Sequence, residues 1–213
     1  MTLLTSSLTM TSQKGCTCGA PIAAMLLWCQ AVPVTIKELW KIKSVTKEVW
    51  QMLEGSFSLS TMPDQLVFYL EGPSPGSDLL IKSVIITCPN CTDYESSRPT
   101  SSCTDDEKII INANFDDSLN SWSGRGCKVA CHDCMAHANI NPTSGKYLAS
   151  ATERTQNWNG IQQDIAGRVK RKLAYEMTAT VRLYGHNVNS ADVRGTLWVQ
   201  GADNREQYIG IVK

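Results

Sequence analysis

From Val32 onward, apolar and polar residues alternate along the chain in a pattern that predicts β-strands. The clearest case is the segment 66–71, LVFYLE, in which every second side chain is apolar and defines one face. Tyr69 and Glu71 fall on the opposite face of that strand. Further strands are predicted at 49–53, 57–59, 79–87, 109–112, 128–130, 147–151, 160–165, 175–184, 192–200 and 207–212, with a break at Gly55 and a strand end at Trp122.

These strands recur at intervals of roughly eight to twelve residues with turn residues between them, which predicts an all-β sandwich. No stretch has the period of a helix. The segment 31–87 carries too little apolar area to fold alone, and 107–213 is denser in strands. The Ser-, Thr- and Pro-rich residues 88–106 are expected to form a linker, and 1–30 an unstructured or foreign leader. The chain ends within a strand pattern, so its C-terminus is expected to be a cut.

Charge and hydropathy exclude two classes of partner. The 20 basic and 20 acidic residues cancel, and no basic stripe of the kind that binds nucleic acid is present. No segment reaches the ~20 apolar residues of a membrane span, and the short apolar run 20–28 is not a convincing signal peptide. Nine cysteines are an odd number, so at least one stays unpaired if the others form disulfides.

The sequence gives little support for a metal site or a catalytic site. The segment CKVACHDCMAH combines thiols and imidazoles that could bind zinc, but they crowd into one short stretch instead of two separate knuckles. A disulfide or plain thiols are therefore favoured, and no metal site is predicted at Cys127, Cys131, His132, Cys134 and His137. No Gly-x-Ser-x-Gly motif occurs, and nothing pairs Glu71 with Glu153 as the two facing carboxylates of a glycosidase. No catalytic residue is predicted.

Trp158 stands in the polar segment RTQNWNG, without apolar neighbours in sequence. Its ring is either an exposed platform or a plug folded against the edge of the sandwich, and the sequence leaves both open. An exposed ring among amides and charges suits the apolar face of a sugar. Tyr208 points away from the core because Ile209 and Ile211 are core-directed, and Arg125 lies between glycines on a predicted turn. Each of these side chains could also be an ordinary surface residue.

Three segments together carry a family resemblance: FDDSLNSWSGRG (115–126), ASATERTQNWNGIQQDI (149–165) and TLWVQGADNREQYIGI (196–211). They closely resemble family 22 carbohydrate-binding modules of plant endo-1,4-β-xylanases, and residues 49–86 resemble the last third of the same module. The resemblance implies a jelly-roll β-sandwich with a xylan-binding cleft, in the extracellular space or the cell wall. Such modules occur in tandem ahead of a family 10 catalytic barrel of ~250 residues, which this chain does not contain.

The resemblance also implies a site. The family's ligand-binding arginine, tryptophan, tyrosine and glutamate match Arg125, Trp158, Tyr208 and Glu71. Glu71 belongs to the end of a first module (31–87), and the other three belong to the first two-thirds of a second (107–213), whose own glutamate would lie beyond the chain. The two segments could close into one sandwich as a circular permutant, which would bring Glu71 and Tyr69 into the same cleft. The rival expectation is a truncated product that aggregates through exposed edge strands.

Some of these modules hold a structural calcium ion, and Asp116 is at the matching position. No other cofactor is expected. The predicted function is non-catalytic binding of xylan, as an accessory part of a xylanase in xylan breakdown or cell-wall remodelling. The alternatives are a glycoside hydrolase acting alone and a protein-interaction module on the same sandwich. The choice between xylan and mixed-linkage glucan, the disulfide pattern and the oligomeric state do not follow from the sequence.

Overall fold

Strands form all the regular structure of the described residues. The computed structural model describes residues 34–35, 44–89, 108–133, 146–185, 188–202 and 204–212, all within one compact unit, Val32–Lys213. These ranges contain no α-helix, which confirms the all-β prediction. It follows that no helix in the described ranges is long and apolar enough to span a membrane.

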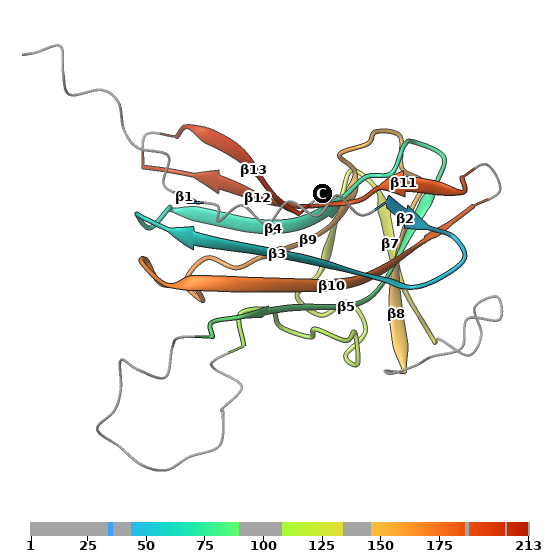
Figure 1. The fold of residues 1–213 in the computed structure, drawn as a ribbon, viewed down its shortest axis with the longest axis horizontal. Helices are drawn as coiled ribbons and strands as arrows, with labels where there is room; N and C mark the ends of the chain where they lie inside the picture. The colour runs from blue at the N-terminus through green and yellow to red at the C-terminus, as the bar shows by residue number, and fades with distance from the viewer. Residues whose placement is uncertain are drawn as a thin grey trace, which may run out of the picture. The chain divides into compact units, whose positions relative to one another are not determined.

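Two antiparallel sheets face each other as a jelly-roll sandwich. The six-stranded sheet has the order β1 (Val34–Thr35), β3 (Gln51–Leu59), β10 (Ala174–Tyr184), β5 (Asp78–Thr87), β8 (Tyr147–Thr152) and β7 (Lys128–Asp133). The five-stranded sheet has the order β13 (Glu206–Val212), β12 (Arg194–Gln200), β4 (Gln65–Glu71), β9 (Gly160–Asp164) and β6 (Ser123–Arg125). A short pair joins β2 (Ser44–Thr46) to β11 (Ser190–Asp192). Figure 1 shows β13, β12 and β4 side by side in one layer and β3, β10 and β5 in the other.

Strands from both segments of the chain share each sheet. β4, from the first segment, lies between β12 and β9 of the second. β10, from the second segment, lies between β3 and β5 of the first. The two segments therefore build a single sandwich, as expected of a permuted chain. Their assignment to two different modules of a longer protein stays a prediction.

The core lies between the two sheets and follows the alternating pattern of the sequence. On β4, Leu66, Phe68 and Leu70 are fully buried, as predicted. From the six-stranded sheet, Phe57 and Tyr175 stack with ring centroids 5.1 Å apart. Each fully buried apolar side chain of this size stabilises the fold by about 1.5–3 kcal/mol relative to leaving it exposed. This packing turns the intervening residues of β4 toward the outer face of the five-stranded sheet.

Several predicted element boundaries are wrong. Residues 109–112 form a bend and a turn and not a strand, and Asn112 at their end has a φ of 53°, in the left-handed region. Gly55 does not interrupt β3, since it lies inside this strand and pairs with Met177 of β10. Arg125 ends strand β6 and does not sit on a turn. The predicted strand 192–200 starts too early, because Asp192 ends β11 and β12 begins at Arg194.

Candidate functional site

The outer face of the five-stranded sheet holds a groove of about 350 Å³. Five side chains line it, and they are the five predicted from the sequence: Tyr69, Glu71, Arg125, Trp158 and Tyr208. They come from β4, β6, the loop between β8 and β9, and β13. The pairing of β4 with β12 and β9 brings together residues that are far apart along the chain.

β4 supplies the floor of the groove. Tyr69 pairs across the strands with Thr196 and Gln162 and is only 2% exposed. Burial, followed by the nearby Glu71 carboxylate, raises the pKa of Tyr69 to about 12. The Tyr69 phenol is therefore neutral at physiological pH and keeps its proton to donate. The Thr196 hydroxyl donates a hydrogen bond to Glu71 Oε1 at 2.8 Å, which fixes the carboxylate at the end of the same strand.

Arg125 connects the rings of the groove. Its guanidinium carbon lies 4.6 Å from the centre of the Tyr69 ring and 5.3 Å from that of Tyr208. Its Nη2 donates a hydrogen bond to Tyr208 Oη at 3.3 Å. These distances lie within the range of cation–π attraction, which favours a planar guanidinium between aromatic faces. The contacts hold a positively charged hydrogen-bond donor against the floor of the groove.

Trp158 rises from the loop between β8 and β9, and 53% of its surface is exposed. The alternative of an exposed ring is therefore confirmed, and that of a ring folded against the sandwich edge is wrong; a role in binding stays a prediction. Arg154, only 4% exposed, anchors this loop from beneath. Its guanidinium donates to the carbonyl oxygens of Pro73 (2.6 Å), Ser77 (2.9 Å) and Asn159 (2.9 Å). Burial lowers the pKa of Arg154, and the nearby Cys127, Asp78 and Glu71 side chains partly oppose that shift.

Asn159 closes the same loop from its other end. Its Oδ1 accepts hydrogen bonds from the backbone N–H groups of Thr155 (3.0 Å) and Gln156 (2.8 Å). Gly160 then passes against β4 so closely that a Cβ atom there would lie 1.7 Å from the carbonyl oxygen of Leu70. Polar groups directed inward thus hold the loop, and Trp158 is turned outward. Sequence reasoning missed the anchoring role of Arg154, because this residue looks like one charge among several in a polar loop.

Tyr208 is 55% exposed and points out of the core, as predicted. Its hydroxyl donates to Glu206 Oε2 at 3.2 Å. The indole Nε1 of Trp198 donates to the same oxygen at 3.3 Å. Sequence reasoning singled out neither Glu206 nor Trp198, although the alternation of β12 places Trp198 on the face opposite the buried Leu197.

Of the thiols in 127–137, the structure describes those of Cys127 and Cys131. Cys127 and Cys131 are free, and burial raises the pKa of both thiols. The Cys131 Sγ donates toward the Phe115 carbonyl on the core side. The next residue, His132, has its Nε2 2.8 Å from Ser150 Oγ. Successive residues of a strand face opposite sides, so these two side chains cannot share one ion. Cys134 and His137 lie outside the described residues.

Asp116, the position matched to a calcium ligand, is exposed in the turns after 109–112. Three backbone carbonyls of this region, from Asp117, Ser118 and Asn120, converge on the side-chain Nδ2 of Asn112 at 3.0–3.3 Å. Within the ranges described by the structure, no group of three or more His, Cys, Asp or Glu side chains could hold a metal ion. A calcium ion at Asp116 stays a prediction.

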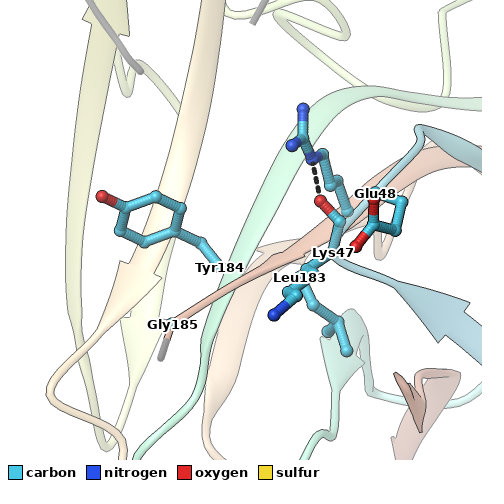
Figure 2. A pocket seen from close by; sticks show the side chains of 6 residues that line it. Lys47, Glu48, Leu183, Tyr184 and Gly185 are labelled. Carbon is cyan, nitrogen blue, oxygen red and sulfur yellow. Dashed lines mark hydrogen bonds between the residues drawn. The ribbon is translucent and has the colours of Figure 1, made fainter. Parts of the chain in front are cut away.

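A second hollow, of about 360 Å³, lies at the end of β10 and contains none of the predicted residues. Lys47, Glu48, Arg182 and Tyr184 contribute to it. Arg182 is already engaged, since its Nε donates to the Lys47 carbonyl at 2.7 Å. Figure 2 shows the Tyr184 ring directed away from Lys47 and Glu48. Tyr184 is the one aromatic residue among those that line this hollow, whereas three aromatic residues line the groove on the five-stranded sheet.

The fold and the groove together define a class of protein. A jelly-roll sandwich is an architecture of lectin domains, and exposed aromatic rings beside a charged donor and a carboxylate are chemistry suited to sugars. The family described as carbohydrate binding domain matches residues 107–213. That match covers half of the chain, and the chain belongs to this family.

The chain is similar to parts of several xylanases. It is 59% identical to endo-1,4-beta-xylanase 1 of Arabidopsis thaliana over 167 residues, which are 78% of this chain and 17% of the relative. It is 49% identical to endo-1,4-beta-xylanase 2 of the same plant, over 78% of this chain and 15% of the relative. It is 25% identical to endo-1,4-beta-xylanase A of Thermoanaerobacterium saccharolyticum, over 81% of this chain and 13% of the relative. The chain thus spans less than a fifth of these relatives, and no solved structure matches it.

Proposed function

We propose that the chain binds xylan, a β-1,4-linked polysaccharide, in the groove on the five-stranded sheet and does not cleave it. The observation that carries the proposal is the convergence of Tyr69, Glu71, Arg125, Trp158 and Tyr208 on one groove. The similarity to three endo-1,4-beta-xylanases supports xylan as the polysaccharide.

Each lining residue has a role in this proposal. The exposed ring of Trp158 stacks on the apolar face of a sugar and orients the chain. Arg125 donates to sugar hydroxyls, and Glu71 accepts from them, so that charge-assisted hydrogen bonds select the hydroxyl geometry. Since Trp158 and Tyr208 are more than half exposed, the bound sugar stays partly hydrated, and we expect modest affinity.

The lack of a second carboxylate in the groove lining supports binding without cleavage. A glycoside hydrolase of the common type places two carboxylates on either side of the scissile bond, about 5–10 Å apart. Glu71 is the one acid among the five residues that line the groove. Glu206 is on β13 and is not among the residues that line the groove. Its carboxylate is engaged by Trp198 and Tyr208.

The proposed setting is that of an accessory part of a xylanase, in xylan breakdown or remodelling of the cell wall. An extracellular location agrees with the family and with the disulfide formed by Cys88, since disulfides persist in oxidising compartments.

Affinity electrophoresis tests the proposal. Purified chain runs in native gels with and without soluble xylan, beside the variant Trp158→Ala and a parallel set of gels with mixed-linkage glucan. We expect xylan to retard the original chain and Trp158→Ala to lose about 1–3 kcal/mol of binding free energy, typical of an aromatic residue central to an interface. A folded chain that xylan does not retard would contradict the proposal and favour a protein-interaction module. Release of reducing sugar from xylan would contradict the non-catalytic part.

A further inference from the structure

The face that carries the groove continues beyond it, toward Trp198. The register of β12 pairs Trp198 with Tyr208 on one side and Val67 on the other. Thr196 pairs with Tyr69 two residues earlier on the same strand. Paired residues of an antiparallel sheet point to the same face, so Trp198 shares the outer face with the floor of the groove.

The Trp198 ring is held in place and remains accessible. Its side chain is half-buried, and its Nε1 donates to Glu206 Oε2 at 3.3 Å. Tyr208 Oη donates to that same oxygen at 3.2 Å, so one carboxylate links the polar edges of both rings. Because Tyr208 also lines the groove, the outer face presents two neighbouring aromatic residues, Tyr208 in the groove and Trp198 beside it.

The far end of this face also carries polar groups. Two residues further along the strands, on the same face, lie Gln65, Gln200 and Glu206, which pair with one another across β4, β12 and β13. An aromatic ring with amide and carboxylate groups beside it repeats the chemistry of the groove. Val67, the partner of Trp198 on β4, lies four residues from Glu71, or about 13 Å along the strand. A ligand bound beside Glu71 would therefore need further sugar units to reach Trp198.

We propose that Trp198 forms an outer sugar-binding position that prolongs the groove along the polysaccharide chain. This inference rests on the proposed function, because the occupant of both positions is the same β-1,4-linked chain. It assigns Glu206 as a positioning residue that orients both Trp198 and Tyr208. In this proposal Trp198 does not contribute to the affinity for sugar units bound in the groove. It contributes only to the affinity for the units that extend beyond the groove.

Calorimetric titration with xylo-oligosaccharides of increasing length tests the inference. For the original chain, affinity rises with length past the point at which the groove is filled. Trp198→Ala leaves the affinity for short oligosaccharides unchanged and lowers that for long ones roughly tenfold. Trp198→Phe, which keeps a ring but not the indole N–H, retains most of the gain with length. Trp50→Ala, which removes a half-buried tryptophan packed on Leu80 and Leu148, serves as the control and follows the original chain.

Three results would overturn the inference. If Trp198→Ala weakens short and long oligosaccharides equally, Trp198 acts only by supporting Tyr208. If it changes neither, Trp198 does not contact the ligand. If the original folded chain binds no oligosaccharide of any length, the proposed function fails, and this inference fails with it. Thermal unfolding of each variant shows that a loss of binding does not reflect a loss of fold.

Discussion

Tyr69 combines a floor position in the groove with a neighbouring negative charge. The phenol is almost fully buried next to Glu71, and both features disfavour the ionised form. Sequence alternation predicted its face correctly but not its burial. That burial depends on Arg125 and Thr196, which reach Tyr69 from strands distant in sequence.

The raised pKa of Tyr69 predicts a loss of stability in alkali. Below the ordinary value of 10.0 the phenol is neutral in the folded and unfolded chain, whereas between 10.0 and about 12 only the unfolded chain loses the proton. The free energy of unfolding therefore falls as the pH rises through this window. Urea denaturation measures this change. Between about pH 9 and pH 11, the free energy of unfolding should fall by about 1 kcal/mol more for the original chain than for Tyr69→Phe. Equal pH dependence of the two proteins would show that Tyr69 titrates normally.

Trp158 illustrates what sequence can and cannot decide for a single residue. Its polar neighbours made exposure one of two open alternatives, and the structure selects it. The deciding features are the buried contacts of Arg154 and the approach of Gly160 to Leu70, which involve other parts of the chain. A local pattern contains no information on such partners.

Among the structural elements, the loop between β8 and β9 depends most on one side chain. Arg154 bonds the carbonyls of Pro73 and Ser77 from the β4–β5 connection and that of Asn159 from its own loop. The guanidinium thus ties the first segment of the chain to the loop that presents Trp158. The planar fork of arginine fits several acceptors in fixed directions, which an ammonium group cannot reproduce.

The substitution Arg154→Lys is therefore expected to be damaging although it keeps the charge. Buried carbonyl groups lose their partners, and we expect the free energy of unfolding in urea to fall by roughly 2–4 kcal/mol. Xylan affinity should fall as well, since the Trp158 loop loses its anchor. Lys128→Ala is the matched control, because Lys128 forms an exposed ion pair with Glu153 beside the same loop and should change stability by less than about 1 kcal/mol. Unchanged stability of Arg154→Lys would refute the anchoring role.

Regular strands were easier to predict than the connections between them. The alternating run 66–71 became β4 almost without change, because burying one face of a strand fixes its register. The short apolar run 109–112 was wrongly predicted as a strand. Ile109 and Ile110 are indeed buried, but the Asn112 side chain bonds three carbonyls of a following turn and holds the backbone there in a left-handed conformation. Apolar periodicity does not report such side-chain to backbone bonds.

For the whole molecule, the central feature is a groove built by both segments of the chain. The family match covers residues 107–213, whereas Tyr69 and Glu71 come from the first segment. The family resemblance made the convergence of the five residues an expectation. The geometry of the groove depends on the pairing of β4 with β12 and β9, a long-range arrangement that no single segment of the sequence specifies.

Calorimetric titration of the Glu71→Gln variant with xylo-oligosaccharide tests this composite groove most directly. The substituted amide keeps an acceptor for the Thr196 hydroxyl but removes the charge, so the fold should persist while a charge-assisted bond to the sugar is weakened. Glu54→Gln, an exposed change on β3 of the other sheet, is the control. We predict that Glu71→Gln binds roughly tenfold more weakly and Glu54→Gln normally. Normal binding by Glu71→Gln, with Trp158→Ala impaired, would contradict a composite groove, because the second segment alone would then form the site.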